Sequence, residues 1–423
     1  MISKNLERIK RLARKNFIIN FFSLTIFQVI ELFIPLVTIP IIISRVGAEK
    51  FGLISFAVVF SYFFQLIIDF GFNTISTRDI SIHKNDKNKI NEIFNNTINS
   101  KLILMIFCFI IYLCIVLCFE KLNSNIEIYI FTFISLIGQS LIPIWFFQGL
   151  QESKYLTISS FLGRFSYLLL ILFFINTEEN YTLIPIFNSI GYFISAMITL
   201  GIIYKKYKIP YKKITSKEFI IQLNKGKFMF FSEIKLYFIS YFNILILGII
   251  SGNTAVAYFV GAEKIIRAIS NLFIPVQNSL FPILAIKLNN DKTYTIRLIK
   301  KILPVVVVLL LLLSILLFVF SENIIFLILG VEMRNSILVF KILSLVPLLT
   351  FLDLFFGKQI LLNLKKEKEF FKVILFIAII NIPLIYFFIT NYGYIGASIS
   401  QLTTQFLLVI GMFYYSYKAL KTN

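Results

Sequence analysis

Cysteine and histidine are scarce in this 423-residue chain, which has three Cys and a single His. The cysteines, Cys108, Cys114 and Cys118, fall in one apolar run, and His83 lies in a polar, basic stretch. The chain also has no zinc-ligand spacing and no nucleotide-binding P-loop. These shortages argue against a disulfide framework, a metal centre and a Cys or His nucleophile. The sequence therefore predicts a protein that is not an enzyme, needs no cofactor, and draws any energy from a gradient, the membrane potential or another subunit.

Charged residues are also few, at 15%, whereas 58% of the residues are hydrophobic and the mean hydropathy is +0.87. A soluble core of this length could not bury so much apolar surface. Apolar runs of bilayer length recur from Phe17 onward without the alternation of a β-barrel. We therefore expect an all-α integral membrane protein with about twelve transmembrane helices, at roughly 17–43, 53–75, 101–119, 128–149, 155–175, 181–204, 228–250, 254–286, 302–320, 335–362, 373–389 and 393–417.

The longest polar connection follows the sixth predicted span. It predicts an N-terminal lobe at 1–204, a basic cytoplasmic connector at 205–227 and a C-terminal lobe at 228–423, arranged around a central cavity. The pentapeptide VGAEK occurs in both lobes, around Gly47 and Gly261. If the lobes are repeats, Gly47 corresponds to Gly252 and the second copy is about nine residues out of register. We expect the first copy to turn the chain and the second to place charges within the bilayer.

Basic residues cluster on one side of the predicted spans. Most of the 41 Lys and Arg residues lie on the side of the two termini, and the opposite side has only Arg45, Lys50, Lys121 and Arg334. By the positive-inside rule, both termini are expected in the cytoplasm. The net charge of +20 then reports topology and contact with anionic lipid headgroups, and it needs no nucleic-acid partner.

Charged side chains inside the predicted spans are candidates for function, because each costs about 2.5–3.5 kcal/mol at the bilayer centre. Glu263 and Arg267 are four residues apart and can share a helix face, whereas Lys264 points elsewhere. This group is either a structural ion pair or a cationic cavity wall that binds phosphate, and both interpretations stay open. The candidates for substrate binding are Arg164, Lys235, Lys264 and Arg267, and those for coupling to an ion are Glu31, Glu233 and Glu263.

Amide side chains inside or near the spans could offer hydrogen bonds to sugar hydroxyls. They are Gln148, Gln151, Asn243, Gln277, Asn278, Gln401 and Gln405.

Four segments together resemble one family. PIIISRVGAEKFGLISF, IIDFGFNTISTRDIS, PIWFFQGLQESKY and LSLVPLLTFLDLFFGKQILLNLKKEKEF are similar to the bacterial polysaccharide exporters that include the O-antigen flippases known as Wzx. These exporters belong to the multidrug/oligosaccharidyl-lipid/polysaccharide flippase superfamily. The resemblance implies an inner-membrane protein that moves an undecaprenyl-diphosphate-linked oligosaccharide to the periplasmic leaflet by alternating access, coupled to H⁺ or Na⁺. It also implies a polysaccharide polymerase and a chain-length regulator as partners.

The matching motifs supply candidate gate residues, Arg45 at the first outer turn and Asp69 and Arg78 at the inner end of the second span. A contact between Asp69 and Arg78 could close a cytoplasmic gate.

Two other functions stay open at this stage. A polysaccharide polymerase or ligase would be expected to carry a large outer loop with Arg or His, whereas the outer loops here are short. A drug/cation antiporter of the same superfamily would be expected to line its cavity mainly with carboxylates and aromatic rings.

Overall fold

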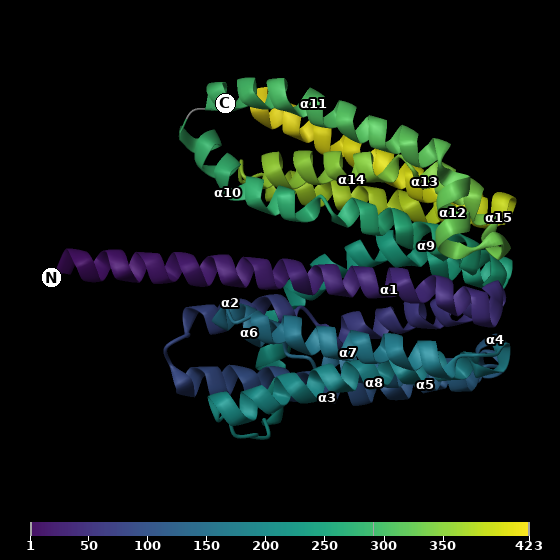
Figure 1. Ribbon diagram of the computed structural model, residues 1–423. Helices are drawn as coiled ribbons and strands as arrows, with labels where there is room; N and C mark the ends of the chain where they lie inside the picture. The colour runs from purple at the N-terminus through teal and green to yellow at the C-terminus, as the bar shows by residue number, and fades with distance from the viewer. Residues whose placement is uncertain (1, 291, 422–423) are drawn as a thin grey trace. The chain divides into compact units, whose positions relative to one another are not determined.

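The protein is described by a computed structural model that covers residues 2–290 and 292–421 (Figure 1). Side chains are described from Asn20 onward, except at 21, 232, 235–236, 238–240, 275, 278–279, 282–283, 286 and 289–292. Regular structure in these residues is helical throughout, so the predicted all-α class is confirmed. Helices suit a membrane because they satisfy every backbone hydrogen bond within one segment.

Nine helical runs among the described residues are long and apolar enough to cross a membrane. Three of them contain a glycine with a positive φ, at Gly47, Gly252 and Gly393, and the helix direction changes there. The number of crossings therefore exceeds the number of runs, in line with the predicted twelve.

Gly47 and Gly252 have nearly the same backbone conformation, with φ/ψ of 75°/168° and 83°/−179°. If the two lobes are repeats in which Gly47 corresponds to Gly252, the two glycines should share a backbone conformation, and they do. Gly261 of the second VGAEK instead lies within a continuous helix, where an added Cβ would come 2.7 Å from the Met333 side chain. The same five letters thus make a turn in one place and a close helix contact in the other.

Replacing Gly47 with Ala is expected to lower the free energy of unfolding by about 1–3 kcal/mol, because this φ/ψ region is nearly restricted to glycine. No described atom lies within 4 Å of the added Cβ, so backbone strain alone causes the loss. Gly201→Ala is the matched control. It places a Cβ in equally open space on a regular helix and should leave stability unchanged or raise it by up to about 1 kcal/mol. Thermal unfolding of the purified variants measures both, and equal melting temperatures would contradict the strain argument.

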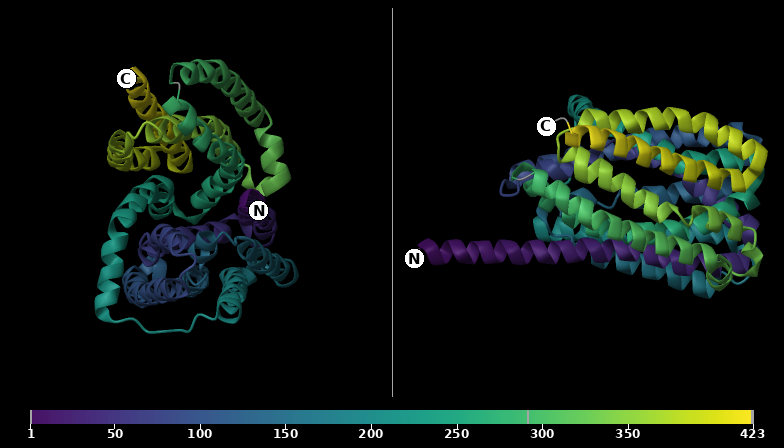
Figure 2. Two further views of the ribbon diagram at one scale, coloured as in Figure 1. Left: turned by 90° about the vertical axis from the view of Figure 1, so that its left-hand side faces the viewer. Right: turned by 90° about the horizontal axis from the view of Figure 1, so that it is seen from above.

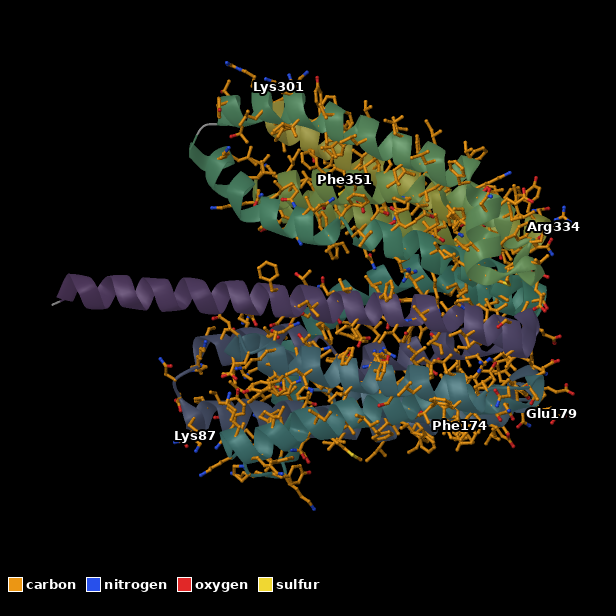
Figure 3. The ribbon with its side chains drawn as sticks, viewed as in Figure 1. Lys87, Phe174, Glu179, Lys301, Arg334 and Phe351 are labelled. Atoms are coloured by element: carbon orange, nitrogen blue, oxygen red, sulfur yellow. The ribbon has the colours of Figure 1, made fainter. Side chains whose placement is uncertain are left out.

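The chain forms two compact units. The N-terminal unit contains Met1–Ile41 and Ala57–Ile234, and the C-terminal unit contains Ile42–Phe56 and Lys235–Asn423. The helices of the N-terminal unit are most of α1 (Ile2–Asp69), α2 (Phe72–Ile82), α3 (Lys87–Cys118), α4 (Glu120–Asn123), α5 (Ile126–Ser140), α6 (Ile144–Leu150), α7 (Lys154–Phe174), α8 (Leu183–Ile202) and the start of α9 (Ser216–Asn271). Lys87 and Glu179 lie at opposite ends of this unit (Figure 3).

Large side chains fill the N-terminal unit. Trp145, Phe146 and Phe147 of α6 are fully buried, and Trp145 and Phe146 pack against Phe94 of α3. Elsewhere in the unit, Tyr112 donates a hydrogen bond to the Tyr129 carbonyl at 3.0 Å, so its buried hydroxyl is satisfied. The opposite face of α3 carries exposed side chains such as Ile106 and is suited to lipid.

An extended coil, Lys208–Thr215, follows α8 and is visible at the edge of the end-on view in Figure 2. Two asparagines of α3 hold its backbone. Asn95 donates to the Pro210 carbonyl at 3.0 Å and accepts from the Lys212 amide at 2.7 Å, and Asn99 donates to the Lys212 carbonyl at 3.0 Å. The predicted connector at 205–227 therefore contains an anchored coil followed by the first turns of α9.

The C-terminal unit contains the rest of α9, α10 (Ile274–Asn290), α11 (Lys292–Val319), α12 (Ser321–Leu329), α13 (Ser336–Leu343), α14 (Val346–Leu354), a π-helical turn at Phe355–Leu362 and α15 (Glu367–Lys421). Lys301 and Arg334 lie at opposite ends of this unit (Figure 3). Its α11 exposes long runs of Val and Leu, whereas polar side chains of α9, α14 and α15 face one another inside the unit. The C-terminal unit therefore has apolar side chains on its outside and polar side chains in its interior, and these polar side chains form the candidate site.

Candidate functional site

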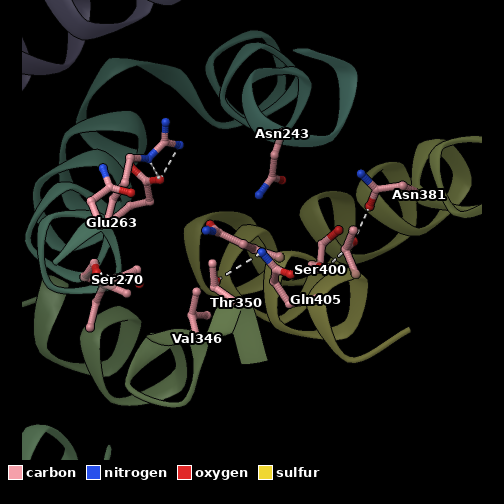
Figure 4. Close-up of a pocket in the computed structure, with 13 residues that line it drawn as sticks. Asn243, Glu263, Ser270, Val346, Thr350, Asn381, Ser400 and Gln405 are labelled. Carbon is pink, nitrogen blue, oxygen red and sulfur yellow. Dashed lines mark hydrogen bonds and ion pairs between the residues drawn. The ribbon is translucent and has the colours of Figure 1, made fainter. Parts of the chain in front are cut away.

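A polar pocket of about 270 Å³ lies inside the C-terminal unit (Figure 4). It is lined by residues of α9, α14 and α15, and α9 and α15 each contribute from both sides of their kinks at Gly252 and Gly393. The lining residues are Asn243, Glu263, Ile266, Arg267, Ser270, Asn271, Val346, Thr350, Asn381, Ser400, Gln401, Thr404 and Gln405. A cavity lined so heavily by amides, hydroxyls and one ion pair is suited to a polar, hydrogen-bonding ligand.

Glu263 and Arg267 form an ion pair on one face of α9, as their spacing predicts. The Arg267 Nε donates to Glu263 Oε1 at 2.6 Å, and the guanidinium lies over the ring of Tyr241, 5.3 Å from its centre. Glu263 has 5% of its side chain exposed, whereas Arg267 keeps 35%. The carboxylate is therefore buried behind the guanidinium, and the guanidinium is the member of the pair that a ligand can reach.

Three oxygens in the pocket are buried without a hydrogen-bond partner among the described residues: Asn243 Oδ1, Ser400 Oγ and Gln405 Oε1. The amide nitrogens are engaged, because Asn243 donates to the Ala397 carbonyl at 2.9 Å and Gln405 donates to Thr350 Oγ1 at 3.4 Å. A buried polar atom without a partner costs about 1–3 kcal/mol, so this group of oxygens is suited to water or to a ligand that supplies donors.

A second charged cluster lies in the N-terminal unit. Arg164 of α7 donates to Glu31 of α1 through Nη2 at 2.6 Å, to Asn188 Oδ1 at 3.1 Å and to the Tyr192 hydroxyl at 2.6 Å. Glu31 also accepts a short hydrogen bond from the Ser160 hydroxyl. The sequence predicted Arg164 and Glu31 as separate candidates, for substrate binding and for ion coupling, and the structure brings them together as one partly buried ion pair.

Close helix packing positions this cluster. An added Cβ on Gly163 would lie 2.3 Å from the Gly191 carbonyl oxygen, so α7 and α8 approach at backbone distance. Because Arg164 follows Gly163, its guanidinium reaches the ring of Tyr192 on α8, 4.3 Å from the ring centre.

The predicted contact between Asp69 and Arg78 is not formed. Asp69 binds the Lys101 Nζ at 2.8 Å, whereas Arg78, with 68% of its side chain exposed, pairs with the adjacent Asp79. Arg78 lies on the exposed side of α2. Lys101 extends from α3 to Asp69 and has only 2% of its side chain exposed. Lys101 also donates to Asn73 Oδ1 at 2.9 Å.

The other predicted residues are placed as follows. Glu233 lies near enough to Asp69 and Lys101 to interact with both electrostatically. Lys264 does not line the pocket and lies over the ring of Phe51 at 5.7 Å. Arg45 is half-buried in the C-terminal unit, and the side chain of Lys235 lies outside the described residues.

Several pocket residues were not predicted, among them Thr350, Asn381, Ser400 and Thr404. A signal for part of this set was present, because Ser400, Gln401, Thr404 and Gln405 recur at the spacing of one helix face within an apolar span. No local spacing relates Asn381 to Thr350, and only the fold brings them to the same pocket.

Comparison with known proteins relates this arrangement to one group. Residues 17–287 match the family described as polysaccharide biosynthesis protein. The chain belongs to this family. Its nine described helical runs of membrane-spanning length indicate a multi-pass membrane protein, and the resemblance inferred from the sequence is confirmed.

Two relatives of this polysaccharide biosynthesis protein are assigned by name to O-antigen transport. The protein from Escherichia coli (strain K12) is 28% identical over 390 residues, which cover 92% of this chain and 94% of that protein. The protein from Shigella dysenteriae is 26% identical over 388 residues, which cover 89% and 94%. Since the relatives are transporters by name, the prediction that the chain is not an enzyme is confirmed.

Solved structures show the fold of this polysaccharide biosynthesis protein. The lipid II flippase MurJ in an inward closed conformation matches with a TM-score of 0.69 at 15% identity, over 95% of this chain and 89% of that chain. An inward-facing multidrug resistance MATE family transporter of the MOP superfamily matches with a TM-score of 0.71 at 13% identity, over 92% and 96%. The fold is therefore shared with both flippases and drug transporters, and the fold alone does not choose the substrate.

Proposed function

We propose that this chain moves an undecaprenyl-diphosphate-linked repeat unit of O-antigen or another polysaccharide from the cytoplasmic to the periplasmic leaflet of a bacterial inner membrane. The two units are proposed to act as the two lobes of an alternating-access cycle, with both termini in the cytoplasm. The names of the relatives and the chemistry of the pocket in the C-terminal unit support this proposal.

The observation that carries the proposal is the combination of one accessible guanidinium with unpartnered buried oxygens in a single pocket. A guanidinium binds phosphate oxygens through parallel hydrogen bonds, and Arg267 faces the pocket while Glu263 balances its charge. Sugar hydroxyls are the donors that Asn243, Ser400 and Gln405 require. A diphosphate attached to sugars offers both groups in one molecule, whereas a hydrophobic cation offers neither.

The remaining candidates keep secondary roles in this proposal. Lys235 and Lys264 are proposed as further cations for the diphosphate. Arg164 could join them only by giving up hydrogen bonds to Asn188 and Tyr192.

Coupling to H⁺ or Na⁺ is also proposed. Glu263 is the best placed of the three carboxylates, because a proton or cation arriving there would release Arg267 from its ion pair. Glu31 holds the same relation to Arg164, and Glu233 lies beside the Asp69–Lys101 pair. A polymerase and a chain-length regulator are proposed to act on the exported units.

Deleting the gene is expected to abolish surface polysaccharide and to leave single lipid-linked repeat units in the cytoplasmic leaflet. In spheroplasts of the deletion strain, these units should resist a membrane-impermeant oxidant such as periodate, and expression of the wild-type chain should make them sensitive. Repeat units already attached singly to the outer lipid core would instead indicate a missing polymerase. Normal surface polysaccharide together with increased drug sensitivity would indicate an antiporter.

A further inference from the structure

A second pocket, of about 390 Å³, opens on the N-terminal unit at the end that carries Lys87 (Figure 3). Three chain segments form it: the turn between α2 and α3 with the first turn of α3, the end of α6 with the turn that follows it, and the π-helical turn Ile203–Tyr207 after α8 with the start of the extended coil. Lys84, Lys87 and Lys206 line it together with a single acidic residue, Glu152. None of these residues belongs to the proposed transport site.

One wall of the pocket is fixed. The Lys206 Nζ donates to Glu152 and to the hydroxyls of Tyr155 and Tyr207, both at 3.1 Å, and it lies 4.8 and 4.7 Å from the centres of the two rings. Burial raises the pKa of Glu152, but its hydrogen bonds with Lys206 and Tyr207 outweigh this and hold the pKa below its usual value. The charges of Glu152 and Lys206 therefore neutralise each other.

The mouth of the pocket keeps an uncompensated positive charge. Lys84 and Lys87 are exposed, and neither takes part in an ion pair with any side chain that the structure describes. Asp86 lies between them along the chain and caps α3 by accepting from the Asn88 and Lys89 amides at 3.0 and 3.1 Å, and its negative charge offsets only one of the two lysines. An anion is the ligand that this mouth favours.

The floor of the pocket is apolar except for one group. Ile90, Leu150 and Ile209 are buried in the core of the unit, so the floor is rigid. Asn91 Oδ1 is buried and has no hydrogen-bond partner within the described part of the chain. The Asn91 oxygen is an acceptor and needs a hydrogen-bond donor from the ligand. A bare phosphate can bind the lysines but supplies few donors. A ligand that carries both a phosphate and a hydroxyl satisfies both features.

Aromatic residues indicate the depth of the pocket in the membrane. Tyr204 and Tyr211, 42% and 51% exposed, flank Tyr207 along the chain. Exposed tyrosines interleaved with lysines are typical of the headgroup layer on the cytoplasmic side.

We propose that this pocket binds the headgroup of an anionic phospholipid, with its phosphate at Lys84 and Lys87 and a headgroup hydroxyl donating to Asn91. The glycerol phosphate headgroup of phosphatidylglycerol has this chemistry. Such a lipid would hold the α2–α3 turn against the π-helical turn Ile203–Tyr207. The site adds lipid dependence to a protein whose proposed transport site lies elsewhere.

The test is native mass spectrometry of the purified full-length protein with phosphatidylglycerol, phosphatidic acid and phosphatidylethanolamine added in turn. Phosphatidylglycerol should bind, and Lys84→Gln with Lys87→Gln should weaken it at least tenfold. Lys212→Gln with Lys213→Gln, on the same unit but outside the pocket, is the matched control and should change little. Asn91→Leu should reduce binding of phosphatidylglycerol more than that of phosphatidic acid, which lacks a headgroup hydroxyl.

Four results would overturn the proposal. Equal losses in the two lysine pairs would mean that net charge alone attracts the lipid. Unchanged lipid binding in the Lys84/Lys87 variant would show that the lipid phosphate does not bind at these lysines. Displacement of the lipid by millimolar inorganic phosphate would indicate a site for a soluble anion, and preferential displacement by undecaprenyl diphosphate would indicate an entry site for transport substrate. Because the readout is lipid binding, it is independent of whether the proposed export activity is correct.

Discussion

Replacing Arg267 with Lys is expected to reduce polysaccharide export by about ten- to a hundredfold while protein accumulation stays near the wild-type level. Lys preserves the charge that neutralises buried Glu263, so the fold is kept. It loses the planar fork that holds two phosphate oxygens at once. A hydrogen bond to a charged group contributes about 1.5–3 kcal/mol, which corresponds to a loss of this size. Surface polysaccharide, divided by the amount of protein in the membrane, is the measurement.

The double variant Glu263→Gln with Arg267→Gln separates binding from charge neutralisation. Two neutral amides leave no buried charge alone, so this variant should fold. Arg267→Ala is less informative, because it leaves the Glu263 carboxylate buried without its partner, at a cost of about 3–5 kcal/mol. If the double variant exports like wild type, Arg267 serves only Glu263 and the phosphate role is wrong. Arg297→Lys, at an exposed position on α11, is the control and should have no effect.

Lys101→Met is expected to destabilise the N-terminal unit by about 3–5 kcal/mol, because it leaves the Asp69 carboxylate without its cation. Lys101 is 2% exposed and its ammonium is held by Asp69 and Asn73, and Asp69 itself is only 19% exposed, so water can replace only part of the lost interaction. The purified variant should melt at a clearly lower temperature in a size-exclusion thermostability assay. Adding Asp69→Asn should restore much of the loss, since the remaining amide can still bond to Gln65, the existing partner of Asp69.

Arg78→Met is the matched control for this prediction. Its pair with Asp79 is exposed, and exposed ion pairs contribute about 0–1 kcal/mol. If Arg78→Met lowers the melting temperature as much as Lys101→Met, Asp69 depends on Arg78 after all, and the gate contact predicted from the sequence regains support.

Lys101 illustrates what the sequence could not reveal about the fold. Hydropathy places the third span at 101–119 and assigns Lys101 to the basic cytoplasmic side, but α3 begins at Lys87. Its first turns are rich in Asn, Ser and Thr, which pack inside the N-terminal unit and bond to the connector and to α2. Apolar windows detect contact with lipid, and they miss helix turns that are buried against protein.

In the candidate site, too, contacts between neighbours in the sequence were predictable, whereas contacts between distant helices were not. The Glu263–Arg267 pair was predictable, because two residues four apart on one helix meet whatever the fold is. The Glu31–Arg164 pair joins helices 133 residues apart, and no local rule relates them. The Asp69–Arg78 contact is not formed in this structure for the same reason, because Asp69 had several possible basic partners and only packing selects Lys101.

The tip of the first helical hairpin, Ile42–Phe56, belongs to the C-terminal unit although it is made early. A Cβ on Gly52 would lie 1.8 Å from the Asn253 carbonyl oxygen, so these two backbones touch in the finished protein. During synthesis, Asn253 leaves the ribosome about 200 residues after Gly52. At 5–20 residues per second, this is a delay of roughly 10–40 seconds. For that interval the tip lacks its final neighbour, so other molecules, such as the insertion machinery, lipid or water, must cover it. A chain that stopped after the sixth span would leave this surface uncovered for good.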